Sequence, residues 1–201
     1  MAVVSGGTTL IDNGALDAAV PSGSLTLLST QTASASATIS FTSGIDSTYD
    51  SYVFKFYDIH ASTDAINFTF QADTGTNTSY NQTITSTIFQ AYNNEAGGST
   101  GLDYLASHDQ AQGTAFQNLT VNTGNGNDES VSGYLEIYNP SSTVFVKHFI
   151  ARINSYNAND FSSDYYTAGY FNLTTALTRF QFKMSSGNID SGVIKLYGIG
   201  G

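Results

Sequence analysis

The sequence contains no cysteine, no tryptophan and only two prolines in 201 residues. The absence of cysteine excludes disulfide bonds, a thiol nucleophile and a cysteine-ligated zinc site. Positive charge is also scarce, since six Lys and Arg face sixteen Asp and Glu for a formal net charge of −10. Because phosphate groups are bound by clustered cations, we expect neither a nucleic-acid partner nor docking on anionic membranes.

Long hydrophobic stretches are missing as well. No run approaches the roughly 18 apolar residues that span a membrane. The first residues, Met-Ala-Val-Val-Ser-Gly-Gly, carry neither the cationic stretch nor the apolar segment of a secretory signal. The sequence therefore predicts a soluble protein made in a cytoplasm.

What the chain does contain is apolar and polar residues in alternation, over short segments separated by turn residues. Phe180, Phe182 and Met184, for example, alternate with polar residues, as do Ile66, Phe68 and Phe70. A period of two is typical of strands with one buried face. The predicted strands are residues 25–30, 35–41, 52–59, 65–71, 83–92, 115–121, 131–138, 143–153, 165–173, 179–184 and 193–199.

This many short strands, without a useful amphipathic helix, indicate an all-β fold. We predict a jelly-roll-like antiparallel β-sandwich over residues 25–201, preceded by an N-terminal arm of residues 1–24. An immunoglobulin-like sandwich is disfavoured by the absence of Cys and Trp. Residues 179–184 and 193–199 are predicted to pair as a hairpin, while residues 102–112 could form a helical turn or a short irregular strand.

The first 24 residues combine turn signals with scattered apolar side chains. Asn13-Gly14 is a strong turn dipeptide. The apolar residues predict an arm that orders against a neighbouring subunit, and a frayed terminus is the alternative. The candidate contact residues of the arm are Val3, Val4, Leu10, Ile11, Leu16 and Val20.

Groups that perform chemistry do not gather in the sequence. His60, His108 and His148 are far apart and lack metal-ligand spacing. Nothing in the sequence selects a carboxylate pair for glycoside hydrolysis. The acidic loop of residues 125–129 does not match an EF-hand. We therefore predict no catalytic residue, no metal site and no cofactor.

Aromatic residues are plentiful, with thirteen Tyr and thirteen Phe. Tyr156, Tyr165, Tyr166 and Tyr170 cluster near the Asn-rich segment of residues 154–160. Tyrosine supplies a large contact area with a polar tip, and such a composition suits an interface with protein or glycan. These four tyrosines are the second group of candidate interface residues.

Three stretches, residues 28–49, 138–143 and 192–199, together resemble small structural proteins of tailed bacteriophages. The last of them, Gly-Val-Ile-Lys-Leu-Tyr-Gly-Ile, is similar to the pattern that closes a compact β-module on virion surfaces. The resemblance covers most of residues 25–199. It implies a stand-alone structural module, because the sequence lacks the long repetitive shaft of a fibre.

Taken with the residues, the resemblance leads to two functional hypotheses. The first is a non-enzymatic capsid decoration or cement protein, a homotrimer bound to the major capsid protein on the phage head. The alternative is a receptor-binding module of a tail fibre or tailspike that binds host surface glycan. Both place the protein in the virion, assembled in the host cytoplasm.

Overall fold

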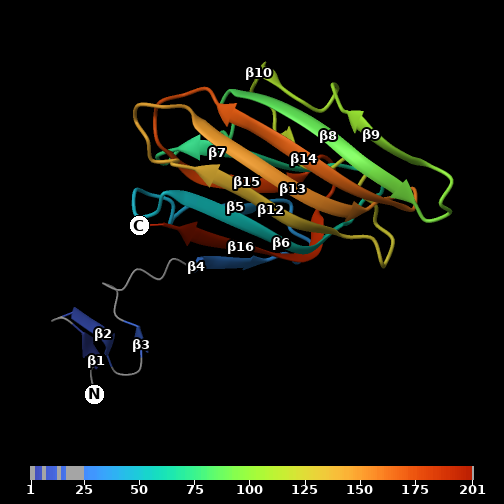
Figure 1. Cartoon of the computed structure of the whole chain (residues 1–201). Helices are drawn as coiled ribbons and strands as arrows, with labels where there is room; N and C mark the ends of the chain where they lie inside the picture. The colour runs from blue at the N-terminus through green and yellow to red at the C-terminus, as the bar shows by residue number, and fades with distance from the viewer. Residues whose placement is uncertain (1–2, 6–7, 13–14, 17–24, 201) are drawn as a thin grey trace.

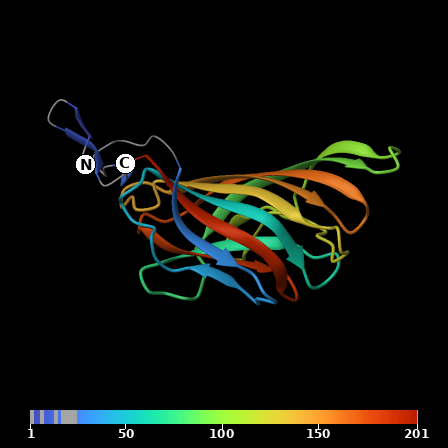
Figure 2. The ribbon, with the colours of Figure 1, turned by 90° about the horizontal axis from the view of Figure 1, so that it is seen from below.

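The computed structural model describes residues 3–5, 8–12, 15–16 and 25–200. All regular secondary structure in these residues is β-strand, and every strand pairing is antiparallel. No helix long and apolar enough to cross a membrane occurs in the described part of the chain. Residues 25–200 form two sheets stacked face to face (Figures 1 and 2). The predicted all-β sandwich is therefore confirmed.

The larger sheet has nine strands. In spatial order they are β10 (Ala111–Gly113), β8 (Ile84–Asn94), β14 (Phe161–Phe171), β13 (Lys147–Tyr156), β12 (Val131–Tyr138), β6 (Ser51–Ala61), β16 (Ile189–Ile199) and β4 (Thr26–Thr32), while β9 (Thr100–Tyr104) also pairs with β8.

The smaller sheet has four strands, in the order β11 (Gln117–Asn118), β7 (Phe68–Thr74), β15 (Leu177–Met184) and β5 (Ile39–Phe41). From β4 to β8 the chain passes from one sheet to the other with each successive strand, as expected of a sandwich built by crossovers. The two sheets differ in size, because the β12–β13–β14 meander lies wholly in the larger one.

The core between the sheets is rich in phenylalanine. The ring of Phe182 lies edge-on to Phe54 and Phe56 at centroid distances of 5.0 and 5.3 Å, and Phe70 meets Phe149 at 5.1 Å. Edge-to-face contacts of this kind stabilise a core beyond the burial of apolar area. Each fully buried Phe contributes about 1.5–3 kcal/mol, so this aromatic cluster is the main stabilising contact between the two sheets.

Several predicted element bounds are corrected by the structure. The strand expected at residues 35–41 is only Ile39–Phe41, because Ala35 has a positive φ of 47° and the preceding backbone bonds to β16 instead. The strand expected from residue 143 begins at Lys147. Before it, Ser142 Oγ accepts hydrogen bonds from the amides of Val144 and Phe145 and forms a turn. The undecided segment of residues 102–112 contributes to the short strands β9 and β10.

The hairpin predicted for residues 179–184 and 193–199 is wrong. Strand β15 pairs with β5 and β7 in the smaller sheet, whereas β16 pairs with β4 and β6 in the larger one. Both strands alternate, so Phe182 and Leu196 enter the same core from opposite sides. The segment between the two strands crosses from one sheet to the other.

The described part of the predicted arm forms a sheet of its own. Strands β1 (Val3–Ser5), β2 (Thr8–Asp12) and β3 (Ala15–Leu16) pair in that order (Figure 1). Asp12 pairs with Ala15, on either side of the Asn13-Gly14 dipeptide, which lies outside the described residues. Among the predicted contact residues, Val3, Val4, Leu10, Ile11 and Leu16 belong to these strands, and Val20 lies outside the described residues.

Candidate functional site

The outer face of the larger sheet exposes an unusual number of large apolar side chains. Alternation along its strands buries one set of residues in the core and leaves the other set exposed. The exposed set includes Leu27, Tyr57, Phe89, Leu102, Tyr104, Tyr134, Tyr138 and Ile150. Val144 and Phe145, each about 70% exposed, extend this surface at one end beside Tyr138. Because exposed apolar patches often mark interaction sites, this face is the candidate functional site.

Seven of these outward positions line up in register across seven neighbouring strands, and we call them the central row. Because directly opposite residues of antiparallel strands share a face, the row forms one continuous line across the sheet. Its members, in spatial order from β9 to β16, are Tyr104, Phe89, Tyr166, Arg152, Tyr134, Lys55 and Lys195.

The middle of the central row is held by direct contacts. The rings of Phe89 and Tyr166 stack at a centroid distance of 4.9 Å and an interplanar angle of 4°. The guanidinium of Arg152 lies 5.0 Å from the Tyr166 ring and donates hydrogen bonds from Nε and Nη2 to Asp164 Oδ2 at 3.1 and 2.7 Å. This carboxylate raises the pKa of Arg152 above its ordinary value. Side chains fixed in this way lose little conformational entropy when a partner binds.

The half of the central row that runs from β13 to β16 is positively charged. Three of the six Lys and Arg of the chain, Lys55, Arg152 and Lys195, lie in it. Lys55 Nζ lies 5.8 Å from the Tyr197 ring and Lys195 Nζ lies 5.4 Å from the Tyr57 ring. Within the described residues neither lysine forms a salt bridge. Like charges on adjacent strands repel, so this arrangement favours an anionic group from outside.

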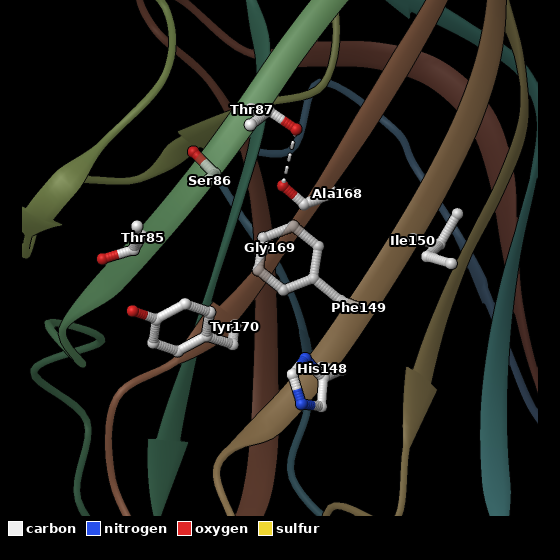
Figure 3. Close-up of a pocket in the computed structure, with 9 residues that line it drawn as sticks. All are labelled: Thr85, Ser86, Thr87, His148, Phe149, Ile150, Ala168, Gly169 and Tyr170. Carbon is white, nitrogen blue, oxygen red and sulfur yellow. Dashed lines mark hydrogen bonds between the residues drawn. The ribbon is translucent and has the colours of Figure 1, made fainter.

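Beside the central row the sheet surface is hollowed (Figure 3). The hollow has a volume of about 460 Å³ and is lined by Thr85, Thr87, His148, Ile150 and Tyr170 around the small residues Ala168 and Gly169. The rings of His148 and Tyr170 lie 6.1 Å apart on its rim. Gly169 is required there, because a Cβ would lie 2.5 Å from the Thr85 carbonyl oxygen and 2.7 Å from the Phe149 ring.

The four tyrosines predicted as interface residues lie in different parts of the structure. Tyr166 belongs to the central row and Tyr170 to the hollow. Tyr156 is half-buried, and its hydroxyl donates to Asp160 Oδ1, which raises the pKa of Tyr156 to about 12.

The prediction of Tyr165 as an interface residue is wrong. Its side chain is only 1% exposed, and its hydroxyl donates a hydrogen bond to the Val121 carbonyl oxygen at 2.6 Å. Burial also raises the pKa of this tyrosine. Neighbouring residues of a strand point to opposite faces, so Tyr165 and Tyr166 cannot both be exposed in the flat sheet.

Sequence reasoning missed most of the central row. Phe89, Arg152 and Tyr134 occur at polar-face positions of their own strands, which is a signal visible in the sequence. Their alignment, however, depends on the pairing of β8 with β14, which joins strands from distant parts of the chain. Local periodicity restricts the register of strands that a short turn joins, but it does not give the order of strands that are distant in the sequence.

His60, His108 and Asp73 serve local structure. His60 Nε2 lies 3.0 Å from the Gly126 carbonyl oxygen, and His108 Nδ1 lies 3.2 Å from Asn118 Nδ2, with burial lowering the pKa of His108. The buried Asp73 accepts hydrogen bonds from the Tyr80 amide and the Gln82 side chain. Across the described ranges, no three His, Asp or Glu residues gather as metal ligands do.

Comparison of the chain with protein-family models, with curated proteins and with solved structures finds no match.

Proposed function

We propose that this protein is a non-enzymatic structural protein of a bacteriophage virion, a capsid decoration protein that docks through the outer face of its larger sheet. The observation that carries the proposal is the central row. Protein interfaces are enriched in Tyr, Phe and Arg at their centres, and the row presents these residue types already ordered by stacking.

The virion setting is supported by the resemblance of residues 28–49, 138–143 and 192–199 to phage structural proteins. These stretches meet at one end of the sandwich, where Ser51 pairs with both Tyr138 and Ile199. Gly198 has no space for a side chain, because a Cβ would lie 2.4 Å from the Tyr49 ring. The resembling residues therefore build a single structural unit.

The charges of the face indicate the chemistry of the partner surface. Lys55 and Lys195 stand without carboxylate partners in the described structure, in a chain with a net charge of −10. A capsid protein surface with carboxylates opposite these lysines would neutralise their repulsion and speed association. In this proposal the subunits form a homotrimer, and the arm of residues 1–24 contacts a neighbouring subunit or the capsid.

The experiment is co-sedimentation of the purified protein with phage heads that lack it, together with imaging of complete virions. We expect Tyr134→Ser and Phe89→Ser each to weaken head binding by about thirtyfold, as loss of an interface hot spot does. Phe116→Ser is the matched control, because Phe116 lies under Lys183 on the opposite side of the sandwich.

Unchanged head binding by both outer-face variants would overturn the docking proposal. Location of the chain only at the tail tip would replace it with the receptor-binding alternative. Equal loss of binding with Phe116→Ser would indicate a general effect on stability rather than a docking face.

A further inference from the structure

A second recess lies on the inner side of the larger sheet, where its β8–β9 end extends beyond the smaller sheet (Figure 2). We call this recess the cleft. It has a volume of about 310 Å³, and no strand of the smaller sheet lines it. Its walls come from β8, β9 and β14 and from three loops, at Ser99, at residues 121–122 and at residues 157–159. Its size lies at the lower end of the range for small-ligand sites.

Two aromatic rings form one wall of the cleft. Tyr92 of β8 and Phe161 of β14 meet edge-to-face with centroids 5.7 Å apart. Tyr92 packs over Gly101, where an added Cβ would lie only 2.5 Å from the tyrosine hydroxyl. The charge of the nearby Asp103 raises the pKa of Tyr92 above its ordinary value. The cleft thus offers ring surface for apolar C–H groups next to a hydrogen-bonding group.

The base of the cleft is rigid. The buried side chain of Asn157 accepts hydrogen bonds from the Asn159 and Phe161 amides at 3.0 and 3.3 Å and donates to Ser163 Oγ at 3.2 Å. The Tyr165 hydroxyl fixes the opposite loop through the Val121 carbonyl oxygen. A site whose supporting groups are already bonded needs little reordering when a ligand enters.

Three other residues that line the cleft have side-chain amides without a hydrogen-bond partner in the described structure. Within the described structure, the side-chain amides of Gln90, Asn122 and Asn159 make no hydrogen bond to protein atoms. Each amide supplies donors and an acceptor, which together match the paired donor and acceptor character of sugar hydroxyl groups. No Lys or Arg lines the cleft, whereas Asp103 does. The cleft therefore disfavours anionic ligands.

We infer that this cleft binds a neutral oligosaccharide, with a sugar ring against Tyr92 and Phe161 and hydroxyl groups bonded to Gln90, Asn122 and Asn159. The inference goes beyond capsid docking, because the cleft lies on the inner side of the sheet and uses none of the central row. It assigns the protein a second surface for host or environmental glycan.

The test is binding of the full chain to a glycan array that contains neutral and uronic-acid oligosaccharides, followed by calorimetry with the best neutral probe. We expect neutral probes to bind and acidic ones not to bind. Tyr92→Ala and Asn159→Ala should each weaken binding about tenfold. Asn93→Ala is the matched control, since Asn93 is the next residue of β8 and is exposed on the other face.

The outcomes are decisive in either direction. Absence of any neutral ligand at about 10 mM, a concentration that detects even weak sites, would overturn the inference. Tighter binding of acidic probes, or equal weakening by Asn93→Ala, would also overturn it. Asn159 is exposed, so its substitution tests the cleft even if Tyr92→Ala fails to fold. Head co-sedimentation of the cleft variants should stay unchanged, which separates this result from the docking proposal.

Discussion

At the scale of single residues, Lys147 at the start of β13 presents an ammonium group in a buried position. Its side chain is 0% exposed, and Nζ donates hydrogen bonds to the carbonyl oxygens of Phe145 and Leu173 at 3.0 and 3.2 Å. Within the described residues no carboxylate forms a salt bridge with it. Removal from water disfavours the charged form, and burial accordingly lowers the pKa of Lys147 below its ordinary value of 10.5.

This lowered pKa predicts a pH dependence of stability. The unfolded chain keeps the proton up to the ordinary pKa of 10.5, while the folded chain releases it earlier. The unfolded state then binds more protons between the two pKa values, so the free energy of unfolding rises with pH in that window. We expect the stability of the wild type relative to Lys147→Met to increase as pH rises toward 10.

Urea denaturation of both proteins at pH 8, 9, 10 and 10.5 would measure the change over the window that ends at the ordinary pKa of 10.5. A constant difference between the wild type and Lys147→Met across this range would show that the folded-state pKa is not lowered. The comparison uses differences, so other titrating groups cancel.

At the scale of elements, strand β16 depends on a glycine at its bulge. Gly192 has a φ of +116°, which side chains with a Cβ rarely adopt. An added Cβ would lie 2.6 Å from the Asp58 carbonyl oxygen and 2.8 Å from Ile59 Cα. Both obstacles are backbone of the paired strand β6, and they cannot move without breaking the ladder between the strands.

We therefore predict that Gly192→Ala lowers the free energy of unfolding by about 1–3 kcal/mol, the cost of a strained backbone position. Gly98→Ala is the control, because a Cβ there meets nothing within 4 Å and the φ of Gly98 is not in the left-handed region. Equal denaturation midpoints for the two variants would contradict the strain argument. Chemical denaturation followed by circular dichroism measures both.

The positions of most strands could be predicted from the sequence, but the sheet to which each strand belongs could not. Alternation identified most strands of the sandwich, because each needs one apolar face. Alternation does not assign strands to sheets, so it cannot distinguish a hairpin of β15 and β16 from two strands in different sheets. Both strands carry the same signal, because each lines the same core.

The candidate site was less predictable for a related reason. The sequence drew attention to tyrosines that are close along the chain, and the structure separates Tyr165 from Tyr166 across the thickness of the sheet. The central row and the cleft each join residues from several strands. Tyr166 and Arg152 pair between the consecutive strands β13 and β14, whereas Phe89 joins them only through the long-range pairing of β8 with β14.

At the scale of the whole molecule, the arm and the sandwich are predicted to be separable. Strands β1 to β3 pair with one another, and within the described residues none pairs with a strand of the sandwich. Deletion of residues 1–24 should therefore leave the melting temperature of the sandwich nearly unchanged while it weakens oligomer formation or head attachment.

Light scattering and co-sedimentation of the truncated protein would measure these effects. Unchanged oligomeric state together with full head attachment would show that the arm plays no part in assembly. A large fall in melting temperature would instead show that the arm stabilises the sandwich itself.

The strand order also determines when the protein can fold. Strand β16 is inserted between β4 and β6, and β15 between β5 and β7. Strand β4 therefore cannot join β6, and β5 cannot join β7, until residues 177–199 have been synthesised. Pairings so distant in sequence fold slowly, and a nascent chain exposes its unpaired edges meanwhile. We expect ribosome-bound chains that stop before β15 to be more sensitive to protease than chains that include β15 and β16.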